Sequence, residues 1–187
     1  MKYKDGSLKK YLDDLSAKLP APGGGSAAAL GAALGASLIS MVVNFTLGKP
    51  RYAKYEKELK NILEKSEKLR SEFLNLVDMD VVVYKSKNMR GCLDIPIMVA
   101  RLCFEGIKLC PVLIKKGNEG LISDVAVAAA LLESALASAY FNVEINLKCL
   151  GDKKLSRSVR KELARKLALA GKMRQKTEER VGKIIRG

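Results

Sequence analysis

The segment from Ala27 to Leu47 constrains the fold most, because it contains no charged residue in a chain that is 29% charged. It is rich in Ala and Gly, and Gly31 and Gly35 form a GxxxG pair that lets another helix approach closely. The segment is long enough to span a bilayer. Ser, Asn and Thr residues dilute its hydrophobicity, however. We therefore favour a central helix that is surrounded by other helices over a membrane span.

The rest of the chain shows helical periodicity and no alternating strand pattern. Ser7, Ser26 and Ser123 are expected helix N-caps, and Pro residues are expected at breaks. This pattern predicts an all-α fold, a bundle of about six helices around the Ala/Gly-rich helix, in one domain over residues 1–187. The expected helices cover residues 8–19, 26–47, 52–87, about 94–111, 123–148 and about 156–185.

Composition excludes several classes of enzyme. The chain has no histidine, which excludes Ser-His-Asp triads, Cys-His dyads and His-containing zinc sites. Its four cysteines form no CxxC pair, so neither a zinc ribbon nor a redox pair is expected, and we predict no metal site. The polar N-terminal residues do not suit a signal peptide. We expect a reduced, cytoplasmic protein.

Positive charge is concentrated near the C-terminus. Residues 151–187 hold 13 Lys and Arg against 4 Asp and Glu, which gives +9 of the total net charge of +14. This charge is either the solvated outer face of the last helix or a landing site for a polyanion, nucleic acid or a polycarboxylate ligand.

The first candidate site is the glycine-rich loop before the uncharged helix, with Gly23, Gly24, Gly25 and Ser26. Glycines let a ligand approach the backbone, and the N–H groups at a helix start favour an anion. No GK[ST] sequence follows, so this is not a nucleotide-binding P-loop. The same glycines are equally compatible with a flexible turn.

The second candidate is Asp80, the only charged residue in the apolar seam of the third helix. A buried carboxylate is costly, and burial raises its pKa toward the range useful for general acid or base catalysis. The alternative is that Asp80 lies where the seam meets solvent.

The third candidate is the helix over 123–148, in which Asp124, Asn142 and Asn146 lie among apolar residues. Asp124 also fits an ordinary helix start. The stripe Asp124, Ala128, Leu131, Ala135, Ser138, Asn142 and Ile145 is expected to face inward. Buried amides form either a structural network or a ligand clamp. Asp124 and Asn142 are about 27 Å apart along the helix, so only a long ligand or a second subunit would unite them.

Several motifs, in this order, resemble the cyclodeaminase/cyclohydrolase family, that is, the C-terminal domain of formiminotransferase-cyclodeaminase and methenyltetrahydrofolate cyclohydrolases. They are PAPGGGSAAAL from Pro20, MVVNFT from Met41, Gly117-Asn118, SDVAVAA from Ser123, and NVEIN from Asn142. The resemblance covers about residues 5–150. It is weaker over Lys85 to Ile95, which lacks the usual Leu-Pro and Arg-bearing segment of the substrate-lining wall.

The resemblance implies a dimeric all-α folate enzyme with the substrate at or near the subunit interface. It implies hydrolysis of 5,10-methenyltetrahydrofolate to 10-formyltetrahydrofolate, or cyclisation of 5-formiminotetrahydrofolate with loss of ammonia. Without histidine, Asp80 or Asp124 is expected to move the proton. Asn142 or Asn146 would orient water or the pterin, and the amides of Gly23 to Ser26 would bind an anionic part of the ligand. No metal or redox cofactor is expected.

The rival hypothesis is a non-catalytic helical protein that binds a polyanion such as nucleic acid through its basic C-terminal helix. The sequence has no recognisable base-reading motif and is only 5% aromatic, so nucleic acid is the less favoured partner. A membrane protein is not expected.

Overall fold

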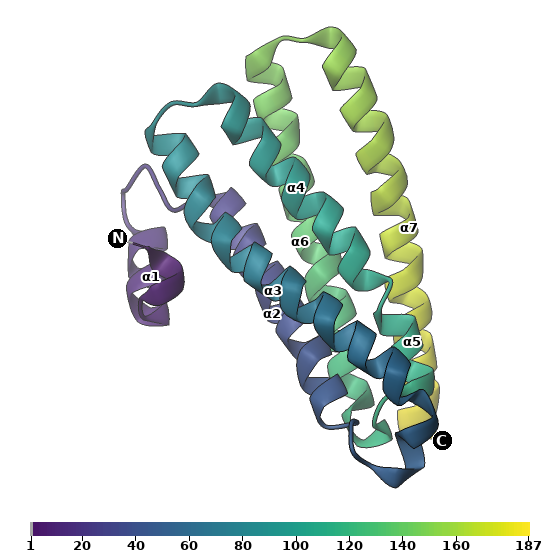
Figure 1. The fold of residues 1–187 in the computed structure, drawn as a ribbon. Helices are drawn as coiled ribbons and strands as arrows, with labels where there is room; N and C mark the ends of the chain where they lie inside the picture. Colours follow the sequence, from purple (N-terminus) through teal and green to yellow (C-terminus); the bar gives the residue numbers. More distant parts are fainter. Residues whose placement is uncertain (1) are drawn as a thin grey trace.

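The structure is a computed structural model that describes residues 2–187, and those residues form an elongated bundle of helices without a strand (Figure 1). The helices are α1 Leu8–Ser16, α2 Gly24–Asn44, α3 Glu56–Lys85, α4 Met89–Ile107, α5 Cys110–Lys116, α6 Ile122–Leu150 and α7 Lys153–Arg186. A short 3₁₀ turn at Tyr3–Asp5 precedes α1, and two others, at Pro50–Tyr55 and Glu119–Leu121, lie between helices. The expected all-α bundle is confirmed.

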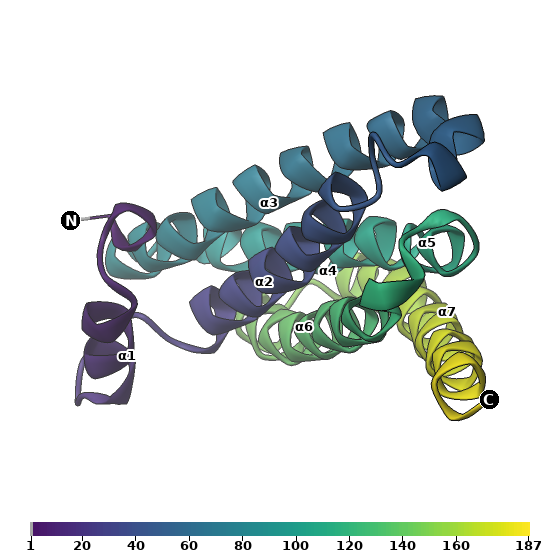
Figure 2. The same cartoon turned by 90° about the horizontal axis from the view of Figure 1, so that it is seen from below.

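The helices form layers around α2 and α4. Both α2 and α4 contact α3 on one side and α6 on the other, while α7 covers α4 and α6, and α1 stands beside the bundle (Figures 1 and 2). The small residues of α2 allow this packing. A Cβ atom added to Gly35 would lie 2.8 Å from Cγ of Leu132, so α2 and α6 approach closely at this glycine.

The expectation that protein surrounds α2 on every side is not met within one chain. Most of α2 is buried, but Leu34 is 54% exposed, and Ala27 and Gly31 are half-buried on the same side. Among the described residues, two segments are long and apolar enough to cross a membrane, α2 and the segment Glu119–Leu150 that contains α6. Core helices of soluble proteins pass the same test, so this composition is weak support for a membrane span.

The apolar seam of α3 is confirmed. Leu59, Ile62, Ser66, Leu69 and Phe73 are buried at alternating steps of three and four residues, and the seam continues to the half-buried Asp80. The 3,4 spacing therefore identified the inner face of this helix correctly.

The start of the fourth helix was predicted too late. Helix α4 begins at Met89 rather than near Asp94 and Pro96, and the side chain of its N-cap, Asn88, accepts a hydrogen bond from the N–H of Gly91 at 2.9 Å. Pro96 lies inside the helix, where it leaves the carbonyl of Cys92 without its usual donor four residues later.

Two expected serine caps were wrong. Helix α2 begins at Gly24 with Gly23 as its N-cap, and Ser26 lies in its first turn. Helix α6 begins at Ile122 directly after a 3₁₀ turn, so Ser123 lies inside the helix and is exposed. The last helix begins at Lys153 rather than near Ser156, because Asp152 caps it by accepting a hydrogen bond from the N–H of Leu155.

The inward stripe predicted for α6 was only partly right. Ala128 and Ala135 are buried, but Ser138 is exposed and Ile145 is 55% exposed. The buried face is instead formed by Val125, Ala128, Ala129, Leu132, Ala135, Leu136, Ala139, Val143 and Leu147. Because α6 is apolar on nearly all sides, periodicity alone did not identify the face that meets the bundle.

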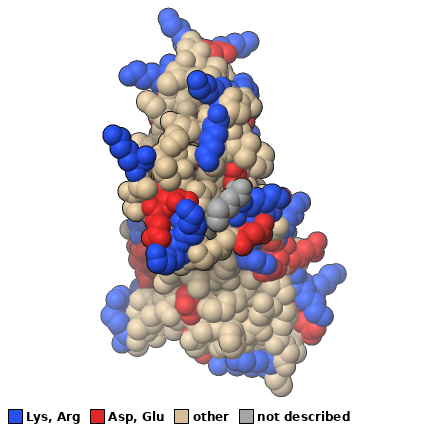
Figure 3. Space-filling model, turned by 90° about the vertical axis from the view of Figure 1, so that its left-hand side faces the viewer, with Lys and Arg blue, Asp and Glu red and all other residues tan. Residues whose placement is uncertain are grey.

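Figure 3 shows the side of the molecule that carries α1. On this side, the part of the bundle below α1 has a wide uncharged area.

Candidate functional site

Most of the predicted site residues meet at one end of the bundle, where α2 begins and where α3 and α6 end. A Cβ atom on Gly24 would lie 3.5 Å from the amide of Asn142, and one on Gly25 would lie 2.2 Å from Oδ1 of Asp80. The start of α2 is therefore held between α3 and α6. This contact brings the glycine-rich loop, Asp80 and Asn142 together from three separate parts of the chain.

The side chain of Asp80 lies against the N-terminus of α2. Its Oδ2 accepts a hydrogen bond from the backbone N–H of Ser26 at 2.9 Å. Only glycine at position 25 leaves room for the carboxyl group, since any Cβ there would overlap it. The positive end of the helix dipole thus faces the Asp80 carboxylate, which takes up one of the N–H groups that the sequence suggested for an anionic ligand.

Burial raises the pKa of Asp80, and the hydrogen bond from the N–H of Ser26 opposes this effect. A carboxyl group with a raised pKa holds and releases a proton closer to neutral pH than an exposed aspartate. The thiol of Cys92, near the start of α4, also has a raised pKa, first because of burial and then because of the charge of Asp80.

Ser26 and Tyr11 fix the position of this end of α2. Oγ of Ser26 donates a hydrogen bond to the carbonyl of Val77 at 3.0 Å and lies 3.2 Å from the hydroxyl of Tyr11, which donates to it. The ring of Tyr11 is 3% exposed and packs edge-on against Tyr3. Sequence reasoning missed Tyr11, because its helical spacing among leucines indicated only a core residue.

Asn146 has a structural partner. Its Nδ2 donates a hydrogen bond of 2.7 Å to the carbonyl of Cys92, the group that Pro96 leaves without a helical donor. This contact favours the structural network over the ligand clamp for that amide. Asn142 instead uses its Nδ2 to bond the carbonyl of Ser138 in its own helix at 2.9 Å, and the side chain borders an open groove.

Asp124 lies at the opposite end of α6. It is half-buried in the first turn of the helix, which continues unbroken past Asn142. The spacing of about 27 Å along the helix therefore holds in the structure. Within one chain, Asp124 and Asp80 belong to different ends of the bundle.

A groove of about 400 Å³ runs between α2 and α6 beside Asn142. Gly24, Ala27 and Gly31 line it from α2, and Leu131 and Ser138 are among the residues that line it from α6. It opens onto the same side of the molecule as the exposed residues of α2. At this end, Gly24 in the first turn of α2 forms part of the wall of the groove.

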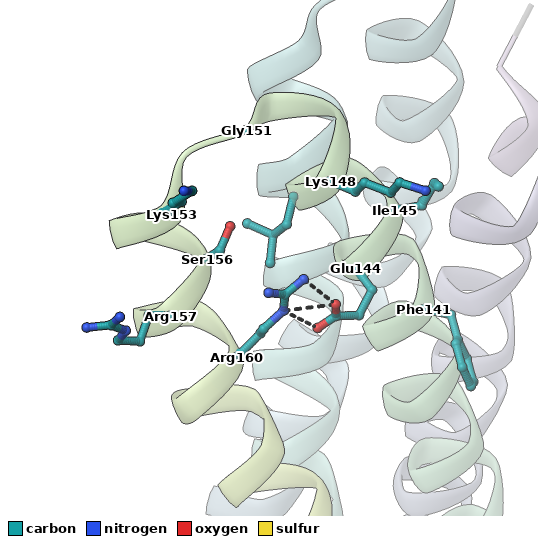
Figure 4. Close-up of a pocket in the computed structure, with 10 residues that line it drawn as sticks. Phe141, Glu144, Ile145, Lys148, Gly151, Lys153, Ser156, Arg157 and Arg160 are labelled. Carbon is teal, nitrogen blue, oxygen red and sulfur yellow. Dashed lines mark hydrogen bonds and ion pairs between the residues drawn. The ribbon is translucent and has the colours of Figure 1, made fainter.

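A larger cavity, of about 850 Å³, lies between the end of α6 and the start of α7 (Figure 4). Arg160 points across it and pairs with Glu144, with Nη2 and Oε2 2.7 Å apart. Lys153 and Arg157 are directed away from this pair toward the outside. The cavity therefore carries a neutralised ion pair inside and unneutralised cations at its rim.

The first site can transfer a proton without a metal ion. It combines a half-buried carboxyl group of raised pKa, backbone N–H groups at a helix start, and a side-chain amide at the edge of a groove. Across residues 2–187, no cluster of three or more Cys, Asp or Glu residues is placed to hold a metal. This arrangement suits general acid–base chemistry on a ligand bound in the groove.

A family model described as formiminotransferase-cyclodeaminase matches residues 7–91 and 85–165 of this chain. Both stretches include residues 85–91, in the segment where the resemblance was weaker. A methenyltetrahydrofolate cyclohydrolase of Methylorubrum extorquens is 35% identical over 94% of this chain and 95% of its own length. The formimidoyltransferase-cyclodeaminase of Rattus norvegicus is 29% identical over 79% of this chain. That match covers 32% of the length of the rat protein.

The fold is also that of a solved relative. The crystal structure of a formiminotetrahydrofolate cyclodeaminase from Thermotoga maritima is similar to this chain with a TM-score of 0.91 and 26% identity. The similarity covers 98% of this chain and 99% of the other.

Proposed function

Because the chain belongs to the formiminotransferase-cyclodeaminase family, we propose that it is a folate one-carbon enzyme. Its reaction is hydrolysis of 5,10-methenyltetrahydrofolate to 10-formyltetrahydrofolate, or cyclisation of 5-formiminotetrahydrofolate with loss of ammonia. The relative named as a cyclohydrolase matches nearly the whole chain and favours the first reaction. The solved cyclodeaminase has the same fold and supports the second.

The observation that carries the proposal is the position of Asp80, half-buried against the first turn of α2, whose Gly24 lines the groove. In the hydrolysis, the carboxylate takes a proton from water as the water oxygen bonds to the methenyl carbon. The resulting tetrahedral carbon then loses its bond to N5 as its hydroxyl proton is released to solvent, and the same carboxyl group returns the first proton to that nitrogen. One group of raised pKa serves both steps.

In the cyclisation, N10 attacks the formimino carbon, and the amino group leaves as ammonia after it receives a proton. Asp80 relays the proton from N10 to the departing nitrogen. Both reactions pass through a tetrahedral carbon, which explains how one site serves either substrate.

The neighbouring groups bind and orient the folate. The N–H groups of Gly24 and Gly25, with Gly23 shaping the turn, face the ligand, while the N–H of Ser26 holds Asp80. Asn142 contacts the ligand from the groove. Asn146 holds the start of α4 in place beside the site through its hydrogen bond to Cys92. Asp124 takes part only if a second subunit brings it near, so Asp80 is the preferred proton-transfer group.

The folate is the substrate, and the mechanism uses no metal or redox cofactor. The protein acts as a cytoplasmic homodimer, in which the exposed side of α2 and α6 is covered by the second copy rather than by lipid. The alternative, a non-catalytic protein that binds nucleic acid through α7, explains the charge but not the Asp80 site.

An absorbance assay of the purified protein with 5,10-methenyl- and 5-formiminotetrahydrofolate tests the proposal. We expect turnover of one or both substrates without added metal. Absence of turnover with either folate, together with tight nucleic-acid binding, would favour the non-catalytic alternative.

A further inference from the structure

The exposed face of α6 carries an apolar stripe that nothing within the chain covers. Its residues follow one another at alternating steps of four and three, the spacing of a helix that packs along a second helix. Phe141 is 74% exposed, Ile145 55% and Val127 49%, which is unusual for large apolar side chains on one stripe. The stripe consists of Val127, Leu131, Ser134, Ser138, Phe141 and Ile145.

A second stripe of the same spacing runs beside it on α2. Ala27, Gly31 and Leu34 are half-buried or exposed on the side where α2 and α6 form the groove. A Cβ atom on Gly31 would meet nothing within 4 Å, so there is open space above this position. Two adjacent helices therefore present stripes of the same residue spacing on the same side of the bundle.

The two ends of the α6 stripe carry opposite charges. One step of three residues before Val127 is Asp124, and one step of three after Ile145 is Lys148. Neither has an ion-pair partner among residues 2–187. A surface that is negative at one end and positive at the other is complementary to a copy of itself turned by 180°.

We propose that two copies of the chain pair through α6 in an antiparallel arrangement, with Asp124 of each copy opposite Lys148 of the other. This deepens the homodimer of the proposed function by assigning its contact surface and register. The pairs across the two-fold axis are then Ser134 with Ser138, Leu131 with Phe141, and Val127 with Ile145. Small serines at the centre permit close approach, and the apolar pairs flank them.

Charge selects this register over its neighbours. If one helix slides by one heptad in one direction, Asp124 lies opposite Phe141 of the second copy. A slide in the other direction places Lys148 opposite Leu131. Each shift buries a charge against an apolar side chain without a partner, which is costly. The proposed register instead leaves each charge opposite its complement at the edge of the interface.

The arrangement also places the candidate site at this interface. Asn142 and Gly24 line the same groove as Leu131 and Ser138, so the second copy lies along one side of the site. Asp124 thereby has a role that does not require proton transfer: it sets the register of the dimer.

Light scattering and the dissociation constant of the dimer test the proposal. Wild type should be a dimer, and Phe141→Asp should weaken it by at least about 100-fold, as expected for loss of a central aromatic contact. Asp124→Lys and Lys148→Asp should each weaken the dimer by about tenfold, since like charges then face each other. The double variant should recover most of the wild-type affinity.

Ser123→Lys is the matched control, because it introduces the same side chain in the same helical turn but outside the stripe, and it should leave the dissociation constant unchanged. Circular dichroism confirms folding of every variant. A monomeric wild type, partition into membranes, or a double variant no tighter than the single ones would overturn the proposal. Turnover of the folates by wild type is measured separately, so failure of the register and failure of the proposed activity are distinguishable.

Discussion

At the scale of single residues, the site depends on a glycine that makes room for a carboxyl group. Asp80 reaches the first turn of α2 only because position 25 has no side chain, and the N–H of Ser26 then holds it. The glycine-rich loop thus positions the proposed proton-transfer group of the protein itself, in addition to its expected role toward the ligand.

Gly25→Ala should displace Asp80 and reduce turnover by about 10²-fold, because small misplacement of a reacting group has a large effect on rate. Gly171→Ala in α7 is the control. A Cβ atom there meets nothing within 4 Å, and alanine should stabilise the helix by about 0.5–1 kcal/mol. Steady-state kinetics and thermal unfolding of both variants check this. Wild-type kcat in Gly25→Ala would show that Asp80 does not need its observed position.

Asp80 should also make stability depend on pH. Burial raises its pKa above the ordinary 3.8, so the native state holds the proton more tightly than the unfolded chain. Stability contributed by this group is present below pH 3.8 and is lost as pH rises toward the raised pKa. Asp80→Asn does not titrate, and its free energy of unfolding should fall less than that of wild type over this range. Urea unfolding at a series of pH values measures the difference. Parallel curves for the two proteins would contradict the raised pKa.

At the scale of elements, α4 and α6 are joined where a proline interrupts the hydrogen bonding of α4. Pro96 provides no N–H to the carbonyl of Cys92, and Nδ2 of Asn146 supplies the missing donor. The start of α4, beside Asp80, is therefore held in place from another helix.

Asn146→Ala should destabilise the protein by about 1–3 kcal/mol, because it leaves the carbonyl of Cys92 without a donor. In a Pro96→Ala background the helix supplies its own N–H, and the same substitution should cost clearly less. A double-mutant cycle by urea unfolding measures this coupling. Equal costs in the two backgrounds would mean that the hydrogen bond contributes nothing to stability.

The basic helix α7 presents cations at steps of four residues, Lys153, Arg157, Lys161 and Arg165, which have no ion-pair partner in the part of the chain that the structure describes. Arg160, also in α7, is instead paired with Glu144. A row of unneutralised cations near the site suits the carboxylates of a polyglutamylated folate.

A polyglutamylated substrate should bind more tightly than the monoglutamate at low salt, and the difference should shrink as salt rises, since the Debye length is only about 8 Å at physiological ionic strength. Gln at Lys153, Lys154, Arg157 and Lys161 should remove this preference and leave kcat for the monoglutamate unchanged. Arg160→Gln is the control, because the charge of Arg160 is already paired with Glu144, and it should leave the preference in place. Equal affinity for both ligands at low salt would assign α7 a different role.

At the scale of the whole molecule, the fold could be predicted from the sequence, and so could most residues of the candidate site. The 3,4 spacing in α3 identified both the buried face and Asp80 as its one charged member. The exposed face of α6 could not be predicted, because the helix has apolar residues of its own on nearly every side. The partner of Ser26 could not be predicted either, since Asp80 comes from a distant part of the chain and takes the place of a local cap.

The family motifs brought the glycine-rich loop and Asn142 into one hypothesis before their contact was visible. Asp124 belongs to a motif on the same helix as Asn142, and the structure keeps it at the other end of α6, as the spacing of about 27 Å along the helix predicts. The order of motifs in a sequence does not specify which residues share a site when a single helix carries two motifs.

Turnover of 5,10-methenyl- and 5-formiminotetrahydrofolate by wild type and by Asp80→Asn, followed by absorbance, tests the central claim most directly. The substitution keeps the shape of the side chain and can still accept the hydrogen bond from Ser26, but it removes the proton-transfer group. We expect a folded variant whose turnover is lower by about 10²–10⁴-fold, the usual contribution of general acid–base catalysis. Wild-type rates in Asp80→Asn would contradict the assignment of Asp80 and shift proton transfer to another group.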